Sequence, residues 1–200
     1  SGIFYNNTTT PRTTTFTITP ILNSCQGTPI TVSVTVNPQI NITVASNTIQ
    51  KCSGLLTILT GISSNISGTT YNWTRDNLIN VSNISDSGAG LNIGVPINNT
   101  FIAQTVNFTI TPTANGCLGT PFTISLIVNP KPNAIASLTT QNICSEEAIQ
   151  DILLSSDVAG TTFNWVRNNT VNVTGISNNG SGNSISGSLT NNTLSNQTVT

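Results

Sequence analysis

The chain of 200 residues carries five basic and six acidic side chains, has no His, and has a formal net charge of −1. This near-neutral balance excludes nucleic acid as a partner, because phosphate binding needs a clear excess of Lys and Arg. It also argues against membrane docking or insertion, since the chain has neither a basic face nor a long apolar run. Thr, Asn and Ser make up 86 of the residues, an uncharged composition typical of extracellular β-proteins.

Regular alternation of apolar and polar residues predicts strands along the chain. The expected strands, in chain order, include residues 30–36, 56–58, 71–73, 106–110, 122–128 and 152–154. Turns are expected at Thr60-Gly61, Ser87-Gly88, Asn115-Gly116 and Asn179-Gly180, because Gly is a strong marker of turns. No segment shows convincing helical spacing, so the sequence predicts an all-β protein.

The chain also repeats itself at a spacing of 92 residues. Residues 16–20 return at 108–112, 25–29 at 117–121, 52–53 at 144–145 and 69–73 at 161–165. A fixed period identifies the unit that folds, and this period is close to a sandwich domain of roughly 100 residues. The expected fold class is therefore tandem immunoglobulin-like antiparallel β-sandwich domains.

Prolines mark the expected domain boundaries, at 37–38 and 129–132, because proline ends strand pairing and stiffens a joint. The expected domains are residues 1–37, the C-terminal strands of one sandwich; 38–129, a complete sandwich; and 130–200, the N-terminal part of the next. The repeat slips by one residue near Thr190. Two explanations of the incomplete ends stay open: a window on a longer repetitive protein, or strand addition between neighbouring molecules.

Two tryptophans occupy equivalent positions in the repeat. Trp73 and Trp165 each share a strand face with an aromatic residue two positions earlier. In immunoglobulin-like sandwiches a Trp on the third strand fills the core, and we expect both Trp residues to be core residues. Stacking on a ligand is the less favoured alternative.

Four cysteines recur in phase with the repeat, which predicts disulfides in an oxidising compartment. Zinc binding is disfavoured because there is no CxxC pair and no His. A bond between Cys52 and Cys117 within one repeat is slightly favoured, although their loops are expected at opposite ends of a sandwich. The other option joins Cys52 to the last-loop cysteine of the following repeat. The partners of Cys25 and Cys144 are expected outside the 200 residues. Cys25–Cys52 and Cys117–Cys144 are the least expected pairs within one chain, since a whole domain would lie between their members.

The sequence offers no arrangement suited to catalysis. Without His there is no Ser-His-Asp or Cys-His arrangement. None of the six acids has an acid at its repeat partner, and no acidic loop has the spacing of a calcium site. We therefore expect no enzyme activity, no cofactor and no metal.

The combined pattern resembles the PKD-like immunoglobulin-fold repeats of long secreted surface proteins of Bacteroidota. The resemblance is carried by Cys-Ser at 52–53 and 144–145, by Gly-Thr-Thr-aromatic-Asn-Trp at 68–73 and 160–165, and by the segments 108–123 and 128–132. It implies adhesins, stalks or filaments at the cell surface. One departure concerns the residues after Trp73 and Trp165, which are Thr-Arg-Asp-Asn and Val-Arg-Asn-Asn instead of the acidic loop of the standard motif.

Three functions are weighed on these grounds. The first is a structural shaft of an extracellular bacterial adhesin or filament, in contact with neighbouring repeats of the same chain or with identical chains. The second is a filament subunit that polymerises by strand exchange. The third is a carbohydrate-binding module for surface glycans or host ligands, for which Phe4, Tyr5, Phe101 and Phe122 are the candidate aromatics.

Overall fold

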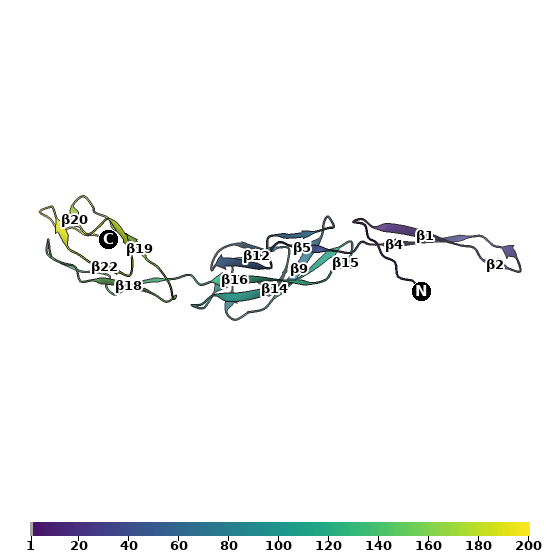
Figure 1. Cartoon of the computed structure of the whole chain (residues 1–200), viewed down its shortest axis with the longest axis horizontal. Helices are drawn as coiled ribbons and strands as arrows, with labels where there is room; N and C mark the ends of the chain where they lie inside the picture. Colours follow the sequence, from purple (N-terminus) through teal and green to yellow (C-terminus); the bar gives the residue numbers. More distant parts are fainter. Residues whose placement is uncertain (1) are drawn as a thin grey trace. The chain divides into compact units, whose positions relative to one another are not determined.

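The structure is a computed structural model that describes residues 2–200. The expected all-β fold class is confirmed, because residues 2–200 form strands, turns and loops and contain no helix (Figure 1). The strands are β1 (Arg12–Ile18), β2 (Ile21–Leu22), β3 (Cys25–Gln26), β4 (Ile30–Val36), β5 (Ile42–Val44), β6 (Thr48–Cys52), β7 (Thr57–Ile58), β8 (Ile62–Ser64), β9 (Thr70–Arg75), β10 (Val81–Ser82), β11 (Ser87–Ala89), β12 (Asn92–Gly94), β13 (Ile97–Asn98), β14 (Gln104–Ala114), β15 (Cys117–Leu118), β16 (Phe122–Asn129), β17 (Ala134–Ala136), β18 (Ile152–Ser156), β19 (Asn164–Val166), β20 (Val173–Gly175), β21 (Asn179–Ser181), β22 (Ser184–Ile185) and β23 (Leu189–Asn191).

The chain divides into two compact units. Unit 1 comprises the described residues up to Asn99 together with Ala103–Asn129, and unit 2 comprises Thr100–Ile102 and Pro130–Thr200. Within unit 1, residues 38–99 and 103–129 form what we call the middle sandwich, and β1 and β4 form what we call the N-terminal hairpin.

The large sheet of the middle sandwich has the strand order β11-β9-β14-β16-β6. Strand β14 (Figure 1) lies between β9 and β16 and pairs antiparallel with both. Strand β6 pairs with β16 in parallel. Alternate residues of β14 are buried, including Val106, Phe108 and Ile110. This is the pattern of a strand with one face on a core and the other toward solvent.

The second layer of the middle sandwich consists of three short pairs, β5–β8, β7–β12 and β10–β13. Leu59, Val81 and Ile93 come from this layer and pack against the buried side chains of the large sheet. The core therefore lies between two layers, as in other β-sandwiches. A smaller apolar cluster of Ile40, Ile66 and Ala114 lies apart from this core.

The N-terminal hairpin repeats the pairing of β14 and β16. Phe16 pairs with Val32 in the hairpin, and Phe108 pairs with Ile124 in the large sheet. Both members of the first pair lie 92 positions before those of the second. The hairpin is thus the structural counterpart of the two central strands of the sandwich.

Unit 2 repeats the earlier strands of the middle sandwich. In β19–β21, Trp165 pairs with Gly180, as Trp73 pairs with Gly88 in β9–β11. The pair Val173–Asn191 corresponds to Val81–Asn98, although the spacing is 92 residues at the Val and 93 at the Asn. The one-residue slip expected near Thr190 therefore lies before Asn191.

Two sequence-based expectations are wrong in detail. Gly88 and Gly180 are not in turns but inside strands β11 and β21, because each lies opposite a Trp whose ring occupies the space of a side chain. Strand β7 forms, but Leu56 and Ile58 are exposed, while Thr57 and Leu59 are buried. The apolar residues at 56 and 58 thus lie on the outer side of the chain.

Candidate functional site

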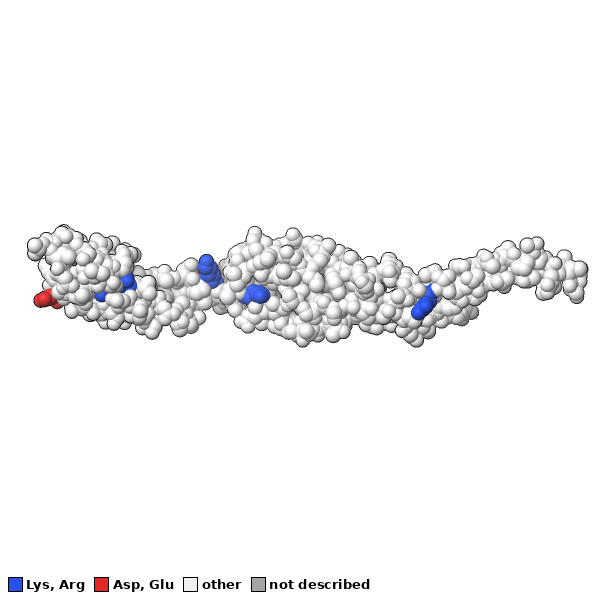
Figure 2. Space-filling view, turned by 90° about the horizontal axis from the view of Figure 1, so that it is seen from above, with Lys and Arg blue, Asp and Glu red and all other residues white. Residues whose placement is uncertain are grey.

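The polar side chains of the described residues form no cluster suited to metal binding. Residues 2–200 contain no group of three His, Cys, Asp or Glu side chains that could hold an ion. A shallow depression on the large sheet is lined by Asn72, Trp73, Thr74, Ser87, Gly88, Thr109 and Thr111, and none of these residues carries a charge. On the face shown in Figure 2, charged atoms are sparse and do not gather into a patch. The candidate functional features are therefore surfaces and joints.

The aromatics considered for glycan binding differ in their positions. Phe4, Tyr5 and Phe101 are exposed, whereas Phe122 packs against the core of the middle sandwich. Phe122 is thus a core-contacting residue, because it belongs to the inward face of β16. Phe4 packs edge-to-face on Phe16 of the hairpin, with ring centroids 6.1 Å apart.

The N-terminal hairpin exposes an apolar face whose counterpart in the middle sandwich is mostly buried, since of the four counterpart residues only Phe122 is half-buried. Phe16, Ile18, Ile30 and Val32 are between 43% and 59% exposed, whereas Phe108, Ile110 and Ile124 are 0% exposed. The difference arises because the second layer of the sandwich covers β14 and β16. An exposed apolar face of this kind favours docking of another surface.

Within the described residues, the counterpart of β9 in unit 2 has an unpaired edge, at the position that β14 occupies beside β9 in the middle sandwich. Strand β9 has β11 on one edge and β14 on the other, and it is six residues long. Its counterpart β19 has three residues and pairs only with β21 among the described strands. Residues 140–144, the counterpart of β6, form no strand. In the middle sandwich β14 and β16 are the strands that pair with β9 and β6, and residues 130–200 contain no counterpart of either.

The two tryptophans also differ in burial between the middle sandwich and unit 2. Trp73 is 5% exposed and belongs to the core cluster, whereas Trp165 is only half-buried. Each ring lies over a glycine, Gly88 or Gly180, where an added Cβ would come within 2.6 Å or 2.4 Å of the ring. The Nε1 atoms of both rings are buried without a hydrogen-bond partner. The rings therefore serve packing, and Gly is required opposite each of them.

The structure does not bring together Cys52 and Cys117, the favoured within-repeat pair. Cys52 lies beside Asn129 at the end of β16, and Cys117 lies beside Ala114 at the hairpin tip before β16 begins. The seven residue steps of β16 alone separate these ends by roughly 23 Å, at about 3.3 Å per residue, whereas Cα atoms in a disulfide lie within about 7 Å. None of the four cysteines is paired in the structure; Cys117 is half-buried and the other three are exposed.

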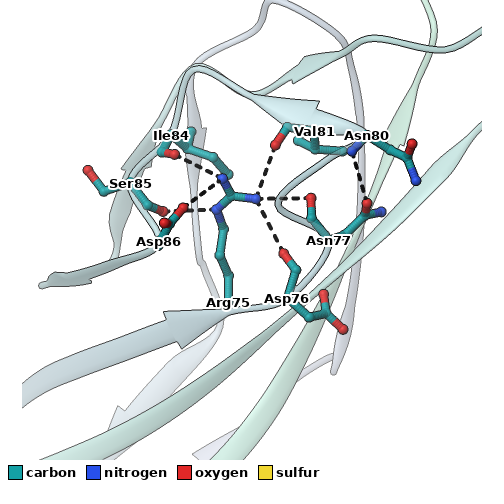
Figure 3. Close-up of polar contacts among 8 residues, drawn as sticks. All are labelled: Arg75, Asp76, Asn77, Asn80, Val81, Ile84, Ser85 and Asp86. Atoms are coloured by element: carbon teal, nitrogen blue, oxygen red, sulfur yellow. Dashed lines mark hydrogen bonds and ion pairs between the residues drawn. The ribbon is translucent and has the colours of Figure 1, made fainter.

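A buried arginine organises the loop that follows β9. The guanidinium of Arg75 is almost fully buried and forms an ion pair with Asp86 at 3.3 Å. It also donates hydrogen bonds to main-chain carbonyls (Figure 3), those of Asp76, Asn77, Val81, Ile84 and Ser85. Five donors in a planar fork suit several carbonyls at once. Arg75 thus holds the loop between β9 and β11 in place.

Arg167 repeats this role in unit 2. It donates hydrogen bonds to the carbonyls of Ile176, Ser177, Asn168 and Val173. Sequence reasoning did not identify either arginine as a structural residue. A signal existed, because two of the five basic residues lie 92 positions apart and each follows a repeated Trp by two positions.

One carboxylate in unit 2 has a shifted pKa. The pKa of Asp157 lies below its usual value of 3.8, because the backbone N–H and side chain of Asn133 donate hydrogen bonds to the ionised carboxylate. The donor–acceptor distances are 3.1 and 2.9 Å. In the middle sandwich the neutral Asn65 accepts the equivalent bond from Asn41 at 2.8 Å. The contact therefore ties β17 to the end of β18 as a structural link.

Comparison with known protein families identifies one that matches this chain. The family described as PKD-like domain matches residues 1–40, 48–132 and 141–200. These three segments follow one another along the chain and together include nearly all of it. No curated protein matches the chain at a significant level.

Proposed function

Because this chain belongs to the family of PKD-like domains, we propose that it is a structural segment of an extracellular bacterial surface protein, the shaft of an adhesin or filament. Domains of this family are typically extracellular and are generally non-catalytic sandwiches. Among residues 2–200, the structure contains no helix that is long and apolar enough to cross a membrane.

The observation that carries this proposal is that structural contacts recur along the chain, whereas acidic residues do not. Trp73 and Trp165 make the same contact with a glycine, and Arg75 and Arg167 bind the carbonyls of equivalent loops. The acidic residues do not recur in this way, since Asp157 stands where the middle sandwich has Asn65. Repetition of packing without repetition of a reactive cluster supports a mechanical role.

This proposal is tested by locating the protein on the cells that produce it. Antibodies raised against residues 38–129 are applied to intact cells and detected by immunogold electron microscopy. The expected result is label along surface fibres, which disappears when intact cells are treated with a protease. Label confined to the cell interior of permeabilised cells would overturn the proposal.

A second candidate function is self-assembly by strand exchange, and the exposed hairpin favours it. In this arrangement the hairpin of one molecule takes, in unit 2 of a second copy, the place that β14 and β16 take in the middle sandwich. Phe16 would then meet Trp165 of the second copy, since Phe108 packs on Trp73 at the equivalent positions. Addition of strands to an open sheet edge is an established mode of recognition.

Sedimentation of the chain over a range of concentrations, with reductant present, tests this second candidate. Head-to-tail oligomers should grow with concentration, and Phe16→Asp should abolish them because a charge would enter an apolar interface. Phe101→Asp is the matched control, since Phe101 is exposed and lies outside the hairpin. A monomer at every concentration, or equal effects of both substitutions, would contradict strand exchange.

A further inference from the structure

The four cysteines occupy two kinds of position, and both kinds lie beside a joint between repeats. Cys25 and Cys117 are at hairpin tips, in β3 and β15. Cys52 is the last residue of β6, and Cys144 is its counterpart 92 residues later, so we call these two the strand-end cysteines. The joints are the Asn-Pro dipeptides at 37–38 and 129–130. Contacts inside unit 1 show what lies at each joint.

The hairpin-tip cysteine contacts the joint that precedes its own repeat. The side-chain amide of Asn37 donates a hydrogen bond to the carbonyl of Asn115 at 2.8 Å and approaches Sγ of Cys117 at 3.4 Å. The tip is held there by packing, because an added Cβ at Gly119 would meet Ile40 at 3.2 Å. Cys117 therefore lies at the start of the middle sandwich.

The strand-end cysteine contacts the joint that follows its own repeat. Cys52 is the direct parallel-strand neighbour of Asn129, and the next residue, Ser53, donates its N–H to the carbonyl of Asn129 at 2.8 Å. Neighbouring strands lie about 4.8 Å apart. Cys52 therefore lies at the end of the middle sandwich, next to the residue that is equivalent to Asn37.

We infer that the hairpin-tip cysteine of one repeat forms a disulfide with the strand-end cysteine of the repeat before it, across the Asn-Pro joint. If the contact between Asn37 and Cys117 recurs at Asn129, a hairpin-tip sulfur meets the same residue that Cys52 already flanks. Two cysteines beside one asparagine can approach to within the Cα separation of about 7 Å that a disulfide requires. The inference rests on the tandem arrangement proposed above.

The hairpin at Asn129 has two sources, the same polypeptide or a second copy of the chain. When a second copy supplies it, Cys25 of that copy takes the hairpin-tip position opposite Cys52. The strand-end Cys144 then lies beside Asn37 of the second copy, where Cys117 of that copy is already placed. Strand exchange thus pairs all four cysteines, as Cys25 with Cys52 and Cys117 with Cys144, each bond joining two molecules.

The bond forms by thiol–disulfide exchange with an external disulfide as oxidant. The thiolate of one of the two cysteines at the joint attacks a sulfur of the oxidant and forms a mixed disulfide, and one oxidant thiolate leaves. The second joint thiolate attacks the mixed disulfide at the protein sulfur and releases the other oxidant thiolate. Two protein thiols lose two electrons and two protons in total, and the oxidant disulfide is reduced to two thiols.

The first experiment equilibrates the 200-residue chain in a buffer of reduced and oxidised glutathione. Free thiols are then alkylated, and disulfide-linked peptides are identified by mass spectrometry after separation on a non-reducing gel. The expected result is covalent oligomers that contain Cys25–Cys52 and Cys117–Cys144 peptides. Cys52→Ser should remove the first peptide and leave the second, and Cys144→Ser should do the reverse.

The second experiment supplies the hairpin within one molecule. Residues 108–129 are repeated after Thr200, because the N–H of Thr200 bonds Asn168 as that of Asn107 bonds Asp76. The cysteine of the added hairpin should lose its reactivity toward the alkylating reagent in the monomer, and it should regain full reactivity in a Cys52→Ser variant. Cys25→Ser is the control that should change nothing at this joint.

The outcomes separate the disulfide from the proposals on which it rests. A bond in the extended chain without covalent oligomers of the original chain supports the joint disulfide and assigns the hairpin to the same polypeptide. The disulfide is overturned, and strand exchange stays intact, if two results occur together. The oligomers of the original chain react with the alkylating reagent at all four thiols, and the extended chain folds without forming a disulfide. A Cys52–Cys117 peptide from a monomer would overturn the inference directly. Surface labelling of cells is independent of each of these results.

Discussion

The rings of Trp73 and Phe108 pack edge-to-face in the middle sandwich, with centroids 5.3 Å apart and an interplanar angle of 77°. This geometry places the positive edge of one ring on the negative face of the other. The two residues come from β9 and β14, which are neighbouring strands of the large sheet. Their contact links the expected core Trp to the strand that lies at the centre of the fold.

Truncation of Phe108 should therefore be costly. Phe108 is 0% exposed, and Phe108→Ala should lower the free energy of unfolding of the middle sandwich by about 3–5 kcal/mol, from lost burial and a cavity. Urea denaturation followed by the fluorescence of Trp73 in a Trp165→Phe background measures this loss. Phe101→Ala, at a residue that is 62% exposed, should change it by less than about 0.5 kcal/mol. Equal losses would contradict the assigned core.

Gly88 should tolerate no side chain while Trp73 is present. A Cβ at this position would lie 2.6 Å from the Trp73 ring, and such overpacking costs about 1–3 kcal/mol. Gly88→Ala should therefore destabilise the middle sandwich by that amount. In a Trp73→Phe background the same substitution should cost less, because the smaller ring leaves space. Additive losses in this double-mutant cycle would show that the ring does not restrict position 88.

Arg75 should be required for its geometry as well as for its charge. Arg75→Lys replaces the planar fork with a single ammonium that cannot reach carbonyls on several sides. Because buried carbonyls would lose their partners, the free energy of unfolding should fall by more than about 2 kcal/mol. Thermal and urea denaturation measure the effect.

Two controls separate the carbonyl contacts from the ion pair. Asp86→Asn should cost less than about 1 kcal/mol, because the Asp86 side chain is mostly exposed and such pairs contribute little. Arg12→Lys, at an exposed arginine of the hairpin, should have no measurable effect. A loss from Asp86→Asn as large as that from Arg75→Lys would show that the ion pair dominates.

Acid should weaken the contact between Asp157 and Asn133. The pKa of Asp157 is lowered in the folded protein by hydrogen bonds from Asn133, so the stabilisation is complete above the unfolded value and is lost as pH falls through the folded pKa. An NMR titration should place the carboxyl pKa below 3.8, the ordinary value for this group. Over the same range the amide of Asn133 should lose protection from hydrogen exchange.

Asp157→Asn is the matched variant, because Asn65 already occupies the equivalent position in the middle sandwich. It should keep the bond from the Asn133 amide and abolish its dependence on acid. An unchanged acid dependence in this variant would assign the effect to another group.

Much of the fold could be predicted because its signals are local. Alternation along 122–128 predicted a strand with one apolar face, and Ile124, Leu126 and Val128 are all buried in β16. The expectation that Trp73 is a core residue rested on its place on an alternating strand and on the Trp that fills the core of immunoglobulin-like sandwiches. Local patterns did not suffice for Gly88, because a glycine beside serine indicates a turn unless the ring across the strand pair is known.

The sequence by itself determined the all-β class and the positions of several strands along the chain, since side-chain alternation acts over a few residues. Only the tertiary structure decided that Arg75 binds the loop carbonyls and that Phe108 of β14 packs on Trp73 of β9. These relationships depend on the register between strands that are distant in the chain. Register is set by long-range pairing and by the packing of two layers, and no short segment of sequence contains that information.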